Sequence, residues 1–67
     1  MFRNLQAEQA RKGMTNQQVA DYLGISRTSY ENKKKTGKFY VTEISNLCEL
    51  FNCAYEYLFA TDEQKSA

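Results

Sequence analysis

Side chains that can hydrogen-bond to the edges of nucleic-acid bases are concentrated in the segment 27–35. The guanidinium fork of Arg27 suits a bidentate contact with guanine, and the amide of Asn32 suits one with adenine. Thr28 adds a hydroxyl and a methyl group, and the carboxylate of Glu31 can accept from cytosine. On a helix of 100° per residue these four side chains spread over one face, which carries no large apolar side chain. The pattern therefore indicates a face that meets a polar partner and not a core face.

Charge is distributed unevenly along the chain, although the formal net charge is only +1. Five cations and one carboxylate give the segment 25–40 a net charge of +4, whereas one cation and five carboxylates give 41–67 a net charge of −4. A run of lysines is ordinarily a solvated face. Beside the polar face of 27–35, it instead favours a surface that meets phosphate groups.

Two short helices joined by a tight turn are expected to position this face. Thr15 is a good helix N-cap, and Gln18 three residues later completes a capping box. Gly24 ends this first helix abruptly, because it adopts the left-handed conformation without a Cβ penalty. Ser26 then caps the second helix, which covers the segment 27–35.

Apolar and small residues in the same two helices are spaced to pack them together. Met14 and Val19 are placed as one hydrophobic staple, and Ile25 and Tyr30 as a second. The small Ala20, four residues before the glycine, leaves room for the second helix to lie close across the first. This arrangement is typical of a helix-turn-helix.

The run MTNQQVADYLGISRTSYENK resembles the helix-turn-helix of the Cro/CI-type phage repressors, also called the XRE family. The similarity extends from about Leu5 to Phe59. It includes the lead-in ARKGMT and the later ISNLCELFNCAYEYLF, which is similar to the last two helices of the family. Matching flanks make the resemblance more specific than one helix-turn-helix pattern. The chain departs from the family at Lys33 and Lys34, where an apolar residue, with Leu or Glu next to it, is usual.

The resemblance implies an all-α fold, a compact lambda-repressor-like bundle of five short helices. It also implies sequence-specific binding of double-stranded DNA by a homodimeric transcriptional regulator, a repressor that occupies a palindromic operator. The helix after Thr15 would cross the DNA backbone while the segment 27–35 enters the major groove. Base readout is expected from Arg27, Thr28, Glu31 and Asn32. Phosphate contacts are expected from Thr15, Asn16, Gln17, Ser26, Lys35 and Lys38.

The N-terminal segment Phe2–Lys12 predicts another helix. Phe2, Leu5 and Ala10 are expected to face inward, and Gly13 ends the helix. Lys33 lies toward the core side of the segment 27–35. We expect its methylenes to lie on the bundle and its ammonium to point outward.

Two further helices are expected after the glycine at position 37, over 41–51 and 55–60. The first of them has the spacing of a buried stripe, formed by Val41, Ile44, Leu47, Cys48 and Phe51. Asn52 suits the left-handed position that follows it. Phe39 and Tyr40, in the preceding loop, are expected to pack against the bundle. The apolar candidates for a dimer interface are Tyr55, Tyr57 and Phe59.

A chain of 67 residues allows one domain, which we place at 1–60 and follow with a frayed polar tail at 61–67. The chain has no histidine, no Gly-rich phosphate loop and no metal-ligand spacing, so we expect no enzyme, no metal and no cofactor. Cys48 and Cys53 cannot complete a tetrahedral zinc site and are expected to be small buried hydrophobes.

No apolar run approaches the ~20 residues of a membrane span, and the start of the chain is polar and charged rather than a signal peptide. We therefore expect a cytoplasmic protein. Two alternatives remain open at this point. One is a protein-interaction module, such as an adaptor or antirepressor, for which an apolar groove would be expected. The other is a fragment of a longer repressor with a C-terminal oligomerisation domain.

Overall fold

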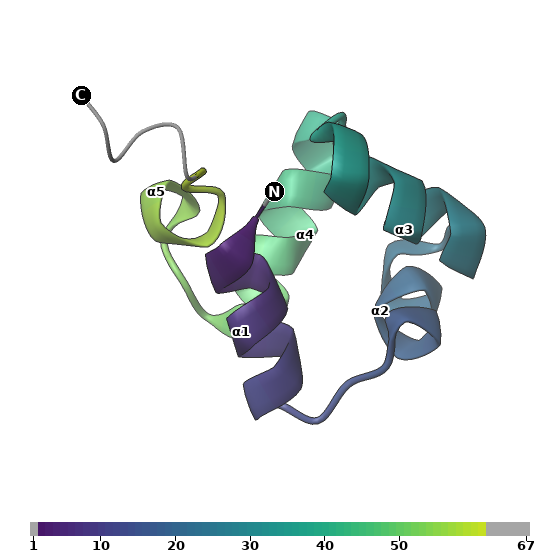
Figure 1. Cartoon of the computed structure of the whole chain (residues 1–67), viewed down its shortest axis with the longest axis horizontal. Coiled ribbons are helices and arrows are strands. Elements are labelled where there is room, and N and C mark those ends of the chain that lie inside the picture. Colours follow the sequence, from purple (N-terminus) through teal and green to yellow (C-terminus); the bar gives the residue numbers. More distant parts are fainter. Residues whose placement is uncertain (1, 62–67) are drawn as a thin grey trace.

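The computed structural model describes residues 2–61, which form five α-helices and no strand (Figure 1). The helices are α1 (Arg3–Arg11), α2 (Asn16–Leu23), α3 (Arg27–Thr36), α4 (Val41–Phe51) and α5 (Tyr55–Leu58). α2 packs against α3 and α4, whereas α5 packs against α1 and α4, so that α4 lies between the two ends of the bundle. The Cα radius of gyration is 11.3 Å, close to the ~11 Å of a compact chain of this length. The expected all-α fold of five helices is confirmed.

Local hydrogen bonds begin and end the helices where the sequence predicts. The side chain of Thr15 accepts from the backbone N–H of Gln18 at 3.1 Å, and Oε1 of Gln18 accepts from the backbone N–H of Thr15 at 2.8 Å. Gly24 ends α2 at φ +76°, in the left-handed region. Ser26 caps α3 by accepting from the N–H of Ser29 at 3.1 Å. The capping box, the glycine turn and the second cap are confirmed.

Side chains from all five helices meet in one core. Its buried hydrophobic members are Leu5, Val19, Ala20, Tyr30, Leu47, Phe51, Leu58 and Phe59. The hydroxyl of the fully buried Tyr30 donates to Oε1 of Gln9 at 2.7 Å, which satisfies a polar group inside the core. The burial of Phe59 removes it from the candidate dimer surface, on which Tyr55 and Tyr57 remain exposed.

The loop before α4 divides its two aromatic side chains between core and surface. The ring of Phe39 contacts Phe2, Tyr30 and Phe59, so its expected packing against the bundle is confirmed. The same expectation was wrong for Tyr40, which is 70% exposed. Tyr40 is the N-cap residue of α4, and its side chain lies at the edge of the bundle.

Two other expected core residues are also exposed. Val41 has 82% of its surface accessible because it begins α4, one turn before the helix meets the core at Ile44. Ala10 is exposed because it lies about 140° round α1 from the buried Leu5. The buried side of α1 instead carries the polar Glu8 and Gln9.

The helix limits differ from expectation by one or two residues at α1, α3 and α5, while Val41–Phe51 agrees in full. Asn52 adopts the predicted left-handed conformation, at φ +53°. Cys48 and Cys53 are free thiols that pack against the core as expected, but they are half-buried and not buried. The expected fraying of 61–67 concerns residues that, apart from Thr61, lie outside the described part of the chain.

Candidate functional site

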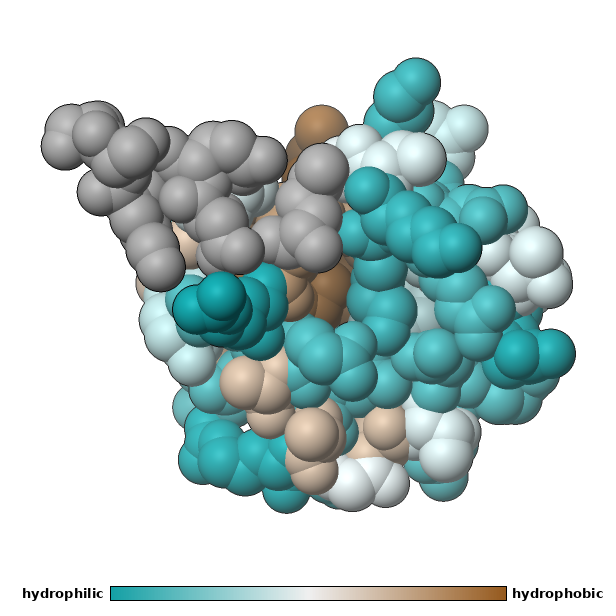
Figure 2. Space-filling model, viewed as in Figure 1, coloured by the Kyte–Doolittle hydropathy of each residue, from teal (hydrophilic) through white to brown (hydrophobic). Residues whose placement is uncertain are grey.

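The polar side chains of α3 lie on the helix face opposite the core. Tyr30 is fully buried, whereas Arg27, Thr28 and Asn32 are exposed. In Figure 2 the side of the molecule formed by α2 and α3 carries mostly hydrophilic side chains. The orientation of α3 derived from its periodicity is confirmed.

Glu31 differs from its neighbours on this face because it is half-buried and accepts two hydrogen bonds. Nη1 of Arg27 lies 3.0 Å from Oε2 of Glu31, and Nδ2 of Asn16 donates to the same oxygen at 3.0 Å. The hydrogen bond from Asn16, followed by the charge of Arg27, holds the pKa of Glu31 below its ordinary value. The carboxylate is therefore ionised and engaged within the protein.

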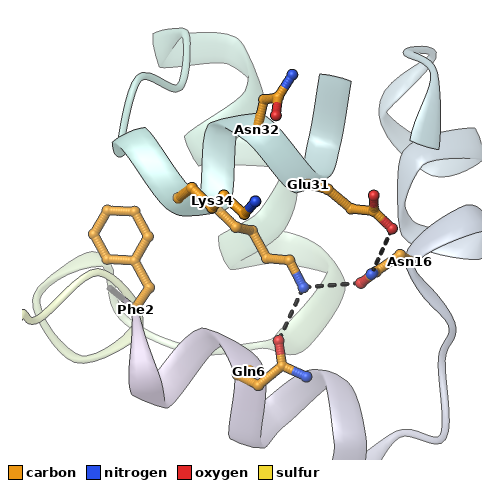
Figure 3. A pocket seen from close by; sticks show the side chains of 7 residues that line it. Phe2, Gln6, Asn16, Glu31, Asn32 and Lys34 are labelled. Atoms are coloured by element: carbon orange, nitrogen blue, oxygen red, sulfur yellow. Dashed lines mark hydrogen bonds between the residues drawn. The ribbon is translucent and has the colours of Figure 1, made fainter. Parts of the chain in front are cut away.

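Lys34 connects three helices, a role that the sequence analysis missed. Its Nζ atom donates to Oδ1 of Asn16 at 2.8 Å and to Oε1 of Gln6 at 2.9 Å (Figure 3). The same ammonium lies 4.7 Å from the centre of the Tyr30 ring, and partial burial lowers the pKa of Lys34. The available signal was its position four residues after Tyr30, which places both on the inward face of α3.

The expectation that the ammonium of Lys33 points outward into solvent was wrong. Nζ of Lys33 lies 3.2 Å from Oε1 of Glu43 and 4.2 Å from the centre of the Tyr40 ring. The Glu43 carboxylate is buried on α4, and the low local dielectric constant there strengthens its attraction for the ammonium. Of the lysines at 33–35, only Lys35 is exposed.

A pocket of about 340 Å³ lies between α1 and the middle of α3 (Figure 3). Its lining residues are Phe2, Gln6, Asn16, Glu31, Asn32, Lys34 and Lys35. The side chain of Asn32 points away from Gln6 and Asn16, toward the outer face of α3. The pocket thus borders the polar face of α3. The hydrogen bonds that connect α3 to α1 and α2 lie in this pocket.

The residues expected at phosphates lie at the starts of α2 and α3 and at the end of α3. The exposed members of this set are Thr15, Gln17, Ser26, Lys35 and Lys38. Asn16 is half-buried; its carbonyl oxygen accepts from Gln9 and Lys34, and one of its amide N–H groups donates to Glu31. The contact between Asn16 and Glu31 therefore joins the start of α2 to α3.

No family model, curated protein or solved structure matches this chain. In residues 2–61, no helix has the length and apolar character needed to cross a membrane. The same part of the chain has no group of three or more side chains suited to holding a metal ion. The site offers hydrogen-bonding groups on one exposed helix face, with exposed lysines at the end of that helix.

Proposed function

We propose that this protein binds double-stranded DNA sequence-specifically through a helix-turn-helix formed by α2 and α3. In this proposal it is a Cro/CI-type transcriptional repressor of the bacterial cytoplasm. The observation that carries the proposal is the exposed face of α3, on which Arg27, Thr28 and Asn32 lie opposite the buried Tyr30. These groups match the hydrogen-bonding patterns of base edges in the major groove.

The turn between the helices supports this assignment. Gly24 ends α2 in the left-handed conformation and Ser26 caps α3 two residues later, so the two helices are joined by a short connection. Ala20 is fully buried where α2 and α3 pack together. In the proposed complex α3 enters the major groove and α2 crosses the backbone.

The charge distribution also supports contact with DNA. The segment 25–40 carries +4 and the segment 41–67 carries −4, so an anionic partner is attracted to one region of the chain. Lys35 and Lys38 are exposed at the end of α3. In the proposed complex they meet phosphates beside the groove.

The starts of α2 and α3 add further phosphate contacts. The first backbone N–H groups of a helix point outward without intrahelical partners and favour anions. Thr15 and Ser26 accept hydrogen bonds as caps, and the exposed Gln17 follows in the first turn of α2. We place these three residues at the phosphates that flank α3.

A homodimer on a palindromic operator is part of the proposal. One recognition helix spans only a few base pairs, which is too little to select one site in a genome. Two copies related by a twofold axis would contact half-sites ~34 Å apart. Tyr55 and Tyr57 are the exposed apolar side chains of α5 from which such an interface can be built.

The proposal is tested by selecting bound genomic fragments at physiological salt and then titrating salt on the selected duplex. We expect a selected site with twofold symmetry and a log–log salt slope of about −0.9 per phosphate neutralised. A flat salt titration, or no duplex binding at ~50 mM salt, contradicts the proposal and favours a protein-interaction module.

A further inference from the structure

The guanidinium of Arg27 is held before any partner arrives. Its Nη1 atom lies 3.0 Å from Oε2 of Glu31, one helical turn later on α3. Arg27 is 56% exposed and Glu31 is 35% exposed in their side chains. An exposed pair of this kind is weak when both members are free to move. Whether it orients Arg27 therefore depends on what holds Glu31.

Glu31 is held by α2. Nδ2 of Asn16 donates to Oε2 of Glu31 at 3.0 Å, and Oδ1 of Asn16 accepts from Nε2 of Gln9 at 2.9 Å and from Nζ of Lys34 at 2.8 Å. Gln9 is buried. A continuous set of hydrogen bonds thus extends from Gln9, on the buried face of α1, through Asn16 to the carboxylate that holds Arg27. Figure 3 shows the middle of this set, where Asn16 contacts Glu31 and Lys34.

Both hydrogen bonds to Glu31 end on the same oxygen, Oε2, which accepts from Nη1 of Arg27 and from Nδ2 of Asn16. Moving Oε2 away would break both bonds together and leave Asn16 with an unpaired amide N–H beside a half-buried site. Asn16 therefore favours the position of the carboxylate at which Oε2 also accepts from Arg27. Keeping both bonds leaves the guanidinium of Arg27 directed along the outer face of α3.

We propose that Glu31 is a positioning residue that orients Arg27 for base readout. The proposal rests on the proposed DNA-binding function. It assigns Asn16, and Lys34 behind it, to holding Glu31 in place. Specificity at the base pair contacted by Arg27 then depends on three residues that need not touch that base pair.

The test compares Glu31→Ala, Arg27→Ala and the double variant on the selected operator and on each of its single-base substitutions. Alanine at the partly exposed position 31 favours the helix, so the fold is retained. We expect Glu31→Ala to reduce discrimination roughly 5- to 10-fold at the base pair that Arg27→Ala also affects. In the double variant, discrimination at that base pair falls no further than in Arg27→Ala. Glu49→Ala, an exposed glutamate on α4, is the matched control and should leave discrimination unchanged.

Two results would overturn the positioning role. The first is a loss of discrimination by Glu31→Ala at a different base pair, additive with Arg27→Ala, which identifies Glu31 as a direct reader. The second is unchanged discrimination in Glu31→Ala. A measurement on the free protein separates this proposal from the DNA-binding function itself. NMR relaxation of the Arg27 side chain should show increased motion in Glu31→Ala without DNA, and equal motion in the parent and the variant would reject the positioning role even if the parent binds DNA.

Discussion

Nζ of Lys33 lies 3.2 Å from Oε1 of Glu43, so that an ion pair joins α3 to α4. The two side chains are only 18% and 8% exposed. The ammonium also lies over the ring of Tyr40, at 4.2 Å from its centre. At this position the two helices are thus connected by a pair of opposite charges.

Replacing Lys33 with Met keeps most of the side-chain volume but leaves the buried carboxylate of Glu43 without its cation and with the hydrogen bond from the backbone N–H of Tyr40. We expect Lys33→Met to lower the free energy of unfolding by about 1–3 kcal/mol, the usual cost of removing one partner of a buried polar group. The measurement is the urea midpoint at unchanged m-value. Lys35→Met, at the exposed neighbouring lysine, is the control and should stay within about 0.5 kcal/mol of the parent. Equal midpoints for the two variants would show that the pair does not hold the helices together.

Ala20 is fully buried on α2, the helix that packs against α3, so its small size is expected to let the two helices lie close together. Ala20→Leu should overpack this contact and cost about 1–3 kcal/mol. Ala7→Leu adds the same atoms at an exposed position of α1 and serves as the control. Thermal unfolding of both variants decides the matter. If Ala20→Leu has the same melting temperature as Ala7→Leu and the parent, α2 and α3 are not closely packed at Ala20.

Glu8 connects α1 to the C-terminal part of the chain. Its carboxylate accepts hydrogen bonds from the Arg11 guanidinium and from the Tyr57 hydroxyl, and these two contacts, Arg11 first, hold the pKa of Glu8 below its ordinary value. A lowered pKa in the folded state means that the stabilisation is fully present above the ordinary pKa of a glutamate. It is lost as the pH falls through the lowered value.

The parent should therefore have a higher thermal midpoint than Glu8→Gln. This difference should be largest above about pH 5 and should decrease as the pH falls toward about 3. Glu49→Gln, at an exposed position of α4, controls for the loss of one negative charge. A difference between the parent and Glu8→Gln that stays constant from neutral to acid pH would contradict the assigned role of the carboxylate.

The lysines at 34 and 35 should act differently in DNA binding. Nζ of Lys34 is already engaged by Asn16 and Gln6, whereas Lys35 is exposed. We expect Lys35→Met to flatten the log–log salt slope by about 1 and Lys34→Met to leave the slope unchanged. The measurement is binding to a random duplex at several salt concentrations. Equal slopes for the two variants would mean that both lysines, or neither, meet phosphates.

Base contacts should be separable from phosphate contacts along α3. Asn32 lies on the exposed outer face, so Asn32→Ala should cost about 1–3 kcal/mol on the selected operator and relax preference at one base pair. Lys38 follows the end of α3, so Lys38→Ala should weaken binding to all duplexes about equally. Each variant is titrated on the operator, on its single-base substitutions and on random duplex. A proportional loss on every duplex for both variants would mean that α3 is docked wrongly.

The sequence by itself determined where α2 begins and ends, where α3 begins, where α4 ends and which face of α3 is polar. Thr15, Gly24, Ser26 and Asn52 act through their own φ angles or through bonds to residues within four positions. Such interactions involve residues that are close together in the sequence, so the local sequence is sufficient to predict them. The burial of Tyr30 follows in the same way from the periodicity of its helix.

Only the tertiary structure decided which polar groups pair. Asn16 contacts Glu31 across 15 positions and Lys34 across 18, and Lys34 contacts Gln6 across 28. Whether these atoms meet depends on how α1, α2 and α3 lie against one another. A helical wheel gives the direction of a side chain but not the element that it faces. For the same reason the helical periodicity predicted Val41 to lie in the core, whereas it is exposed at the start of α4. From the sequence Glu31 is one more polar group on the outer face of α3, and only the position of α2 shows that one of its oxygens already accepts from Asn16.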